Sequence, residues 1–106
     1  MVPGSDLAWS TSCFPHCDYP MQDTLFAQVA SALRPGGVFY LEHVEQRPGF
    51  PECGDEHRGP AGRYWRSPSD AVRIAASHGL MNTNIVTRSL GKTCPLTGYF
   101  LRLVKS

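Results

Sequence analysis

The sequence lacks long apolar runs, an excess of one charge and a large number of cysteines. No run approaches the roughly 20 consecutive apolar residues that cross a bilayer, so we expect no membrane segment. Ten basic residues stand against nine acidic ones, which gives no electrostatic reason to expect nucleic acid binding. Residues 1–10 lack the pattern of a signal peptide, and four cysteines do not require a disulfide framework. We therefore expect a cytoplasmic protein with reduced thiols.

The composition favours one small folded domain. The chain has 106 residues, of which 42% are hydrophobic, and this is compatible with a globular core. Internal repeats and low-complexity tracts are absent from the sequence. We therefore expect residues 1–106 to form one domain of modest stability.

Apolar spacing predicts an alternation of strands and helices. Apolar runs predict strands at 5–10, 38–41, 84–88 and 98–104, and helical spacing predicts helices at 21–33 and 68–78. The order strand, helix, strand, helix, strand, strand is typical of an α/β fold with a parallel sheet, finished by an antiparallel last strand. Residues 46–66 are rich in glycine, proline and charge, and predict a long irregular loop.

The boundaries of the two helices are marked by particular residues. Residues 35–37 read Pro-Gly-Gly and predict an abrupt end of the first helix, before a strand that starts at Val38. Ser67, followed by Pro68 and Asp70, predicts the start of the second helix. The continuous apolar run at 38–41 predicts a strand that is buried on both faces.

Several of these segments carry a family resemblance. Residues 33–37 (LRPGG), 41–44 (LEHV) and 6–11 (DLAWST) resemble the second half of a class I S-adenosylmethionine-dependent methyltransferase, closest to the small-molecule and thiol methyltransferases of the type 11 group. The resemblance implies a partial Rossmann-like methyltransferase sheet over residues 1–106. It also implies methyl transfer from S-adenosylmethionine to a small acceptor, with a thiol favoured.

Members of that family bind the cofactor with an earlier half that this sequence does not contain. It has no Gly-x-Gly-x-Gly loop of the kind that holds the cofactor. We therefore expect a truncated form that is not competent alone. The strand at 5–10 would have an unpaired edge, and such an edge can pair with another chain. A non-enzymatic module that pairs through this edge is the alternative.

The candidate site residues follow the predicted strands, because ligands bind at the carboxyl ends of strands in open α/β sheets. By the resemblance, Ser10, Thr11 and Ser12 would lie beside the cofactor. His16 and Glu42 would face the acceptor, and His43 could act as a general base because its ordinary pKa lies near neutrality. The competing interpretations are a polar end of a strand for the first three and solvated loop positions for the others.

A zinc site is a further alternative. Cys13, His16 and Cys17 form one compact cluster and Cys53 and His57 another, with ligand spacing that zinc sites use. A structural zinc would also stabilise a small domain. Because both clusters fit as loops in the methyltransferase interpretation, we expect no metal.

Overall fold

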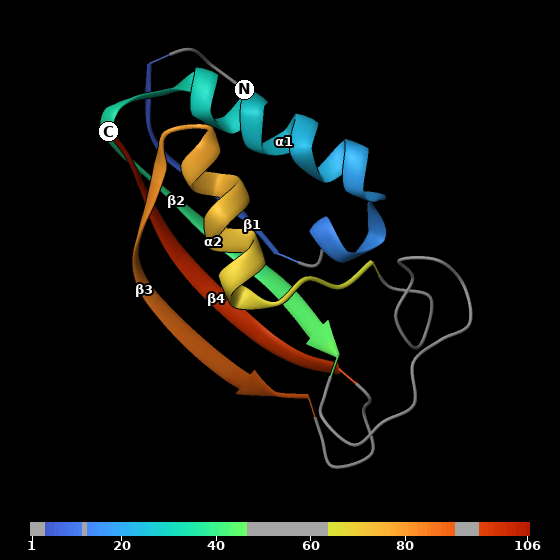
Figure 1. Ribbon diagram of the computed structural model, residues 1–106. Coiled ribbons are helices and arrows are strands. Elements are labelled where there is room, and N and C mark those ends of the chain that lie inside the picture. The colour runs from blue at the N-terminus through green and yellow to red at the C-terminus, as the bar shows by residue number, and fades with distance from the viewer. Residues whose placement is uncertain (1–3, 12, 47–63, 91–95) are drawn as a thin grey trace.

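The computed structural model describes residues 4–11, 13–46, 64–90 and 96–106 (Figure 1). Its elements in chain order are strand β1 (Ser5–Ser10), the 3-10 helix η1 (Phe14–His16), helix α1 (Tyr19–Ala32), strand β2 (Leu33–Gln46), helix α2 (Pro68–Ser77), strand β3 (Leu80–Ser89) and strand β4 (Leu96–Lys105). The predicted alternation of strands and helices is confirmed, with η1 as an addition.

The four strands form one sheet in the order β1-β2-β4-β3. β1 runs parallel to β2, with Ala8 opposite Phe39 and Ser10 opposite Leu41. β4 lies between β2 and β3 and is antiparallel to both. The α/β class and the antiparallel last strand are therefore confirmed.

Strand β2 starts earlier than the sequence predicts. Residues 35–37 lie inside it rather than in a turn before Val38. The reason is an irregularity in the pairing with β1, because Ser5 pairs with Leu33 whereas Leu7 pairs with Val38. β2 thus accommodates extra residues opposite a short stretch of β1.

Two glycines make this irregularity possible. Gly36 has a φ of 83°, which side chains other than glycine rarely adopt. A Cβ at Gly37 would lie 2.9 Å from the carbonyl oxygen of Arg34 and 3.1 Å from that of Ser5. Gly37 therefore lets β1 approach β2 directly after α1 ends.

Both helices begin at capped positions. The side chain of Asp18 accepts a hydrogen bond of 2.9 Å from the Met21 N–H, so α1 begins two residues before the predicted start at Met21. The side chain of Ser67 accepts from the Asp70 N–H at 3.2 Å, which confirms the predicted start of α2. Gly79, with a φ of 79°, follows the end of α2.

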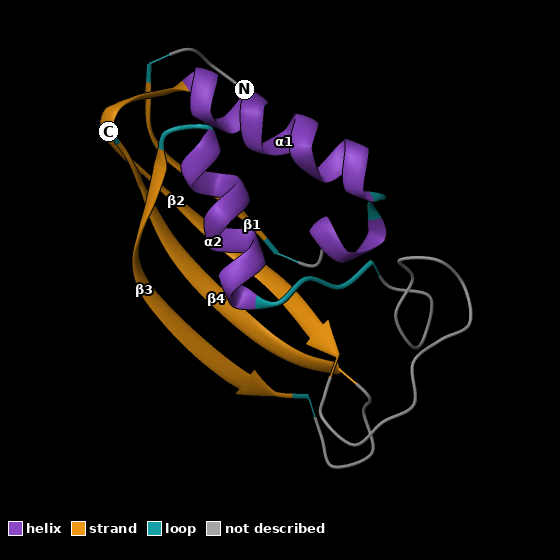
Figure 2. Ribbon diagram, in the orientation of Figure 1, coloured by secondary structure: helices purple, strands orange, loops and turns teal. Residues whose placement is uncertain are grey.

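The two helices lie over the same face of the sheet (Figure 2). Phe39 and Leu41 point to this face and are buried, whereas Tyr40 between them is 44% exposed. The expectation that 38–41 is buried on both faces is therefore wrong among the described residues, since no described element covers the second face. The buried core comprises mainly Phe14, Phe26, Leu33, Phe39, Leu41, Leu80, Tyr99, Leu101 and Leu103.

Only part of the predicted loop at 46–66 can be compared with the structure. Gln46 still belongs to β2, residues 47–63 lie outside the described residues, and residues 64–66 have no regular structure. Within the described part of the chain, no helix is long and apolar enough to cross a membrane.

Candidate functional site

The carboxyl end of β1 carries the predicted cofactor-binding residues. Ser10 is the last residue of β1 and Thr11 follows as an exposed residue, whereas Ser12 lies outside the described residues. The hydroxyl oxygen of Ser10 is buried and has no hydrogen-bond partner among the described residues. A buried hydroxyl without a partner is costly, so Ser10 offers an unused polar group at this end of the sheet.

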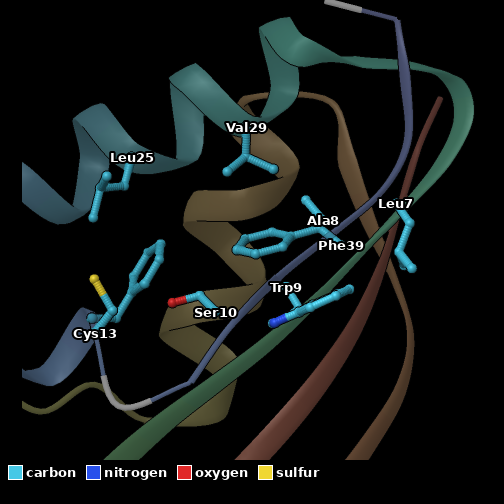
Figure 3. Close-up of a pocket in the computed structure, with 9 residues that line it drawn as sticks. Leu7, Ala8, Trp9, Ser10, Cys13, Leu25, Val29 and Phe39 are labelled. Atoms are coloured by element: carbon cyan, nitrogen blue, oxygen red, sulfur yellow. The ribbon is translucent and has the colours of Figure 1, made fainter. Parts of the chain in front are cut away.

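An apolar pocket of about 370 Å³ lies along β1 and beneath α1 (Figure 3). Leu25 and Val29 of α1 face Ala8 of β1 across it, and Ser10 and Cys13 lie at the carboxyl end of the strand. The walls are thus mostly apolar, with a hydroxyl and a thiol at that end. Such a pocket suits an apolar group that also presents one hydrogen-bonding atom.

His43 lies on the helix-covered face of β2 and is fully buried. Its Nδ1 accepts a hydrogen bond of 2.8 Å from the Val44 N–H, and its Nε2 lies 3.0 Å from Oε1 of Gln22. Burial and then the neighbouring charge of Arg66 lower its pKa to about 3. The imidazole is therefore neutral, and both of its nitrogens have a hydrogen-bond partner. The general-base role of His43 stays a prediction.

Glu42 and His43 are separated although they are neighbours in sequence. Successive side chains of a strand point to opposite faces, so Glu42 lies on the face that no described helix covers. One carboxylate oxygen lies 3.7 Å from NH1 of Arg88 on β3. His16 ends η1 and is exposed, with its backbone N–H donating to the Cys13 carbonyl at 3.0 Å. The structure thus distributes these three residues over two faces and a surface turn.

Three residues of this region carry contacts that the sequence analysis did not identify. Gln22, Arg66 and Asp70 form a chain of hydrogen bonds, with Arg66 Nε donating to Gln22 Oε1 at 2.8 Å and Arg66 NH1 donating to Asp70 Oδ2 at 2.6 Å. Gln22 occupies a position of the buried face of α1, close to Phe26. The sequence signal that could have identified Gln22 is its position as a polar residue on the apolar face of the helix.

The zinc hypothesis can be compared with one of its two clusters. Cys13 is exposed and Cys17 is half-buried, and both are free thiols. The Sγ of Cys17 lies 3.5 Å from the carbonyl oxygen of Cys13. No group of three possible ligands occurs among the described residues, and Cys53 and His57 lie outside them.

The fold has well-defined counterparts among solved structures, although neither a protein-family model nor a curated protein matches the chain. A S-adenosylmethionine-dependent methyltransferase from Methanosarcina mazei superimposes with a TM-score of 0.76 at 16% identity, over 98% of this chain and 60% of that one. The 1,6-didemethyltoxoflavin-N1-methyltransferase of Burkholderia thailandensis, solved with S-adenosylhomocysteine, gives 0.71 at 17% identity, over 95% and 44%. The [4+2]-cyclase SpnF gives 0.75 at 14% identity, over 99% and 51%.

The cyclase shows that this fold does not fix the reaction. The chain spans 44% to 60% of the length of these three structures. The mixed sheet with its parallel β1–β2 pair agrees with that partial match. The chain therefore has part of the class I S-adenosylmethionine-dependent methyltransferase fold.

Proposed function

We propose that this chain contributes part of the site of an S-adenosylmethionine-dependent methyltransferase that acts on a small acceptor, and that it is not competent alone. The observation that carries the proposal is the buried Ser10 hydroxyl, which lacks a partner among the described residues at the carboxyl end of β1. In open α/β sheets this is the end where ligands bind. The likeness to solved methyltransferases over 95–98% of the chain supports the kind of reaction.

Each predicted site residue would have a separate role in binding. Ser10, together with Thr11 and Ser12, would hydrogen-bond the cofactor, whose sulfonium supplies the reactive methyl group. His16 and Glu42 would contact the acceptor. Transfer of this methyl group depends mainly on in-line positioning, so the site does not require a catalytic triad.

The test is binding of S-adenosylhomocysteine to the full chain, followed by NMR. Because the chain spans 44% to 60% of the length of the three solved structures compared above, we expect weak binding, with a Kd of about 1 mM or above. Chemical-shift changes should centre on Ser10 and Thr11 and should be lost in Ser10→Ala. The matched control is Ser77→Ala, an exposed serine on α2. Absence of shift changes with ligand at about ten times that Kd would overturn the proposal.

A second function is favoured by the outer edge of β1. Leu7 and Trp9 are 48% and 71% exposed, whereas Ala8 between them is buried, and all three are among the residues that line the apolar pocket. Parallel strands are normally covered on both faces. We therefore also propose that β1 pairs with another α/β chain, such as one that supplies the cofactor-binding half.

Association should depend on the residues of that edge. Light scattering of the chain over a range of concentrations, alone and with a candidate partner, measures it. Trp9→Lys should weaken association, whereas Val86→Lys, which changes an exposed side chain on β3, should not. A monomer that binds no α/β partner would exclude this second function.

A further inference from the structure

Gln22 is a buried amide that makes contacts with both ends of its side chain. The Nε2 group donates to the carbonyl oxygens of Phe14 and Cys17 at 2.9 Å each, and to that of Tyr64 at 3.1 Å. An amide nitrogen has two protons, so one of them is shared between two carbonyls. This end of the side chain therefore ties α1 to η1 and to the segment before α2.

The oxygen of the same amide meets two nitrogen atoms. Arg66 Nε donates to Oε1 at 2.8 Å, and His43 Nε2 lies 3.0 Å from Oε1. The carbonyl groups on one side can only accept and the arginine on the other can only donate. This pattern fixes which atom of the amide is oxygen and which is nitrogen.

The orientation of the amide and the neighbouring Val44 N–H together select the protonation of His43. Since Gln22 Oε1 is an acceptor, His43 Nε2 must carry a proton to bond with it. His43 Nδ1 accepts from the Val44 N–H and carries none. The imidazole is thus neutral and held as a single tautomer, and it stacks on Tyr99 with ring centroids 5.7 Å apart.

The segment before α2 is attached to the same unit by its backbone. The Tyr64 N–H donates to the Pro15 carbonyl at 2.9 Å, and the Arg66 N–H donates to the Val44 carbonyl at 3.0 Å. η1, the carboxyl half of β2 and residues 64–66 therefore meet around one side chain. η1 follows the carboxyl end of β1, and Arg66 is bonded to Val44 near the carboxyl end of β2.

We propose that Gln22 is the positioning residue of the candidate site, fixing His43 as its Nε2–H tautomer and joining η1, β2 and residues 64–66 into one rigid unit. The importance of this unit for methyl transfer rests on the function proposed above. The tautomer of His43 and the rigidity of the unit do not depend on that function. The proposed function and the proposed role of Gln22 are therefore tested by different measurements. Binding of S-adenosylhomocysteine tests the first, and the spectra below test the second.

Glutamine fits this position better than glutamate or methionine, which have side chains of similar length. A glutamate would place a carboxylate against three carbonyl oxygens, and a methionine would leave both sets of partners unsatisfied in a buried position. Gln22→Met keeps the length and helix propensity of the side chain, so it removes the hydrogen bonds with little change of shape. Gln28→Met makes the same substitution at an exposed position of α1 and is the matched control.

The experiment uses the full chain labelled with ¹⁵N. Imidazole spectra of the wild type should show His43 protonated at Nε2 only, and amide exchange should be slow at Tyr64 and Arg66. In Gln22→Met we expect a mixture of tautomers and at least tenfold faster exchange at both amides, with an unchanged rate at Ala75 of α2. Gln28→Met should resemble the wild type in every respect.

Two results would overturn the proposal. One is a wild-type His43 protonated at Nδ1 or present as a mixture, and this measurement holds even if Gln22→Met does not fold. The other is a folded Gln22→Met variant that retains the single Nε2–H tautomer and slow exchange at Tyr64 and Arg66.

Discussion

His43 and Tyr99 stack in the core with their ring planes at 16° to each other. The Tyr99 hydroxyl donates a hydrogen bond of 2.9 Å to the Arg66 carbonyl, so the stack connects β2 and β4 to the chain in front of α2. Burial raises the pKa of Tyr99 and lowers that of His43. Both rings are therefore neutral at physiological pH, and a proton added to His43 or removed from Tyr99 would disturb several segments together.

Acid should destabilise the chain through His43. Its pKa is about 3 in the folded chain, against 6.5 for the free side chain. Between these two values the unfolded state binds more protons, so stability falls as the pH drops. A difference of one bound proton changes the free energy of unfolding by ~1.4 kcal/mol per pH unit. Arg66 and Asp70 are the charged groups that face the His43 ring.

Urea unfolding at pH 7, 6, 5 and 4 measures this dependence. His43→Asn should show a shallower loss of stability than the wild type between pH 6 and 4, because the titrating group is gone. Equal slopes in the two proteins would contradict the buried, neutral state of His43.

Gly37→Ala should separate β1 from β2. The new Cβ would meet the backbone oxygens of Arg34 and Ser5 at 2.9 and 3.1 Å, and backbone atoms cannot yield as a flexible side chain does. We expect a loss of about 1–3 kcal/mol in the free energy of unfolding. Gly98→Ala is the control, since its nearest contact would be an ordinary 3.5 Å; a similar loss in both variants would contradict the close approach at Gly37.

Truncation of a core side chain should be costly in a domain this small. Leu41 is fully buried on β2, so Leu41→Ala should lower the free energy of unfolding by about 2–5 kcal/mol. Leu90, which is 41% exposed after β3, should tolerate the same change with a loss of at most about 0.5 kcal/mol. Thermal unfolding of both variants distinguishes the two sites, and equal stability would place Leu41 outside the core.

Asp70 should contribute more than an ordinary surface carboxylate. Burial raises its pKa, but hydrogen bonds from Arg73 and Arg66 outweigh that effect and leave the pKa lowered. Asp70→Asn should therefore cost about 1 kcal/mol at pH 7, because the partly buried Arg66 loses its partner. The contribution should disappear in acid, as the pH falls through the lowered pKa.

Asp6→Asn is the matched control for that change. Asp6 pairs with Arg34, and the side chains are 75% and 56% exposed. Exposed ion pairs contribute little, so chemical unfolding should detect almost no change at Asp6. A loss at Asp6 equal to that at Asp70 would contradict the importance of burial.

Local signals in the sequence predicted most of the fold. Ser67 and Pro68 gave the start of α2 correctly because capping acts within one helical turn. Residues 35–37 were identified as a helix terminator but not as part of β2. That outcome depends on pairing with Ser5, about thirty residues earlier in the chain, and no local pattern contains it.

The candidate site was less predictable for the same reason. The end of the first strand at Ser10 was predicted correctly from the local pattern, whereas the role of Ser10 stays a prediction. The surroundings of His43 depend on Gln22 and Arg66, which come from a helix and from a segment beyond residues 47–63. A titratable side chain beside a buried amide has a different chemistry from the same side chain in water, and only the tertiary structure reveals which neighbour it has.

The position of β4 has a consequence for how the chain is made. β4 lies between β2 and β3 and pairs with both, although it is the last of the four strands to be synthesised. Until it leaves the ribosome, β2 and β3 have no common neighbour, and the backbone groups with which they pair to β4 stay unpaired. The described sheet therefore cannot close before Leu96–Lys105 is available, and a chaperone that assists folding would meet β2 and β3 unpaired on the sides that face β4.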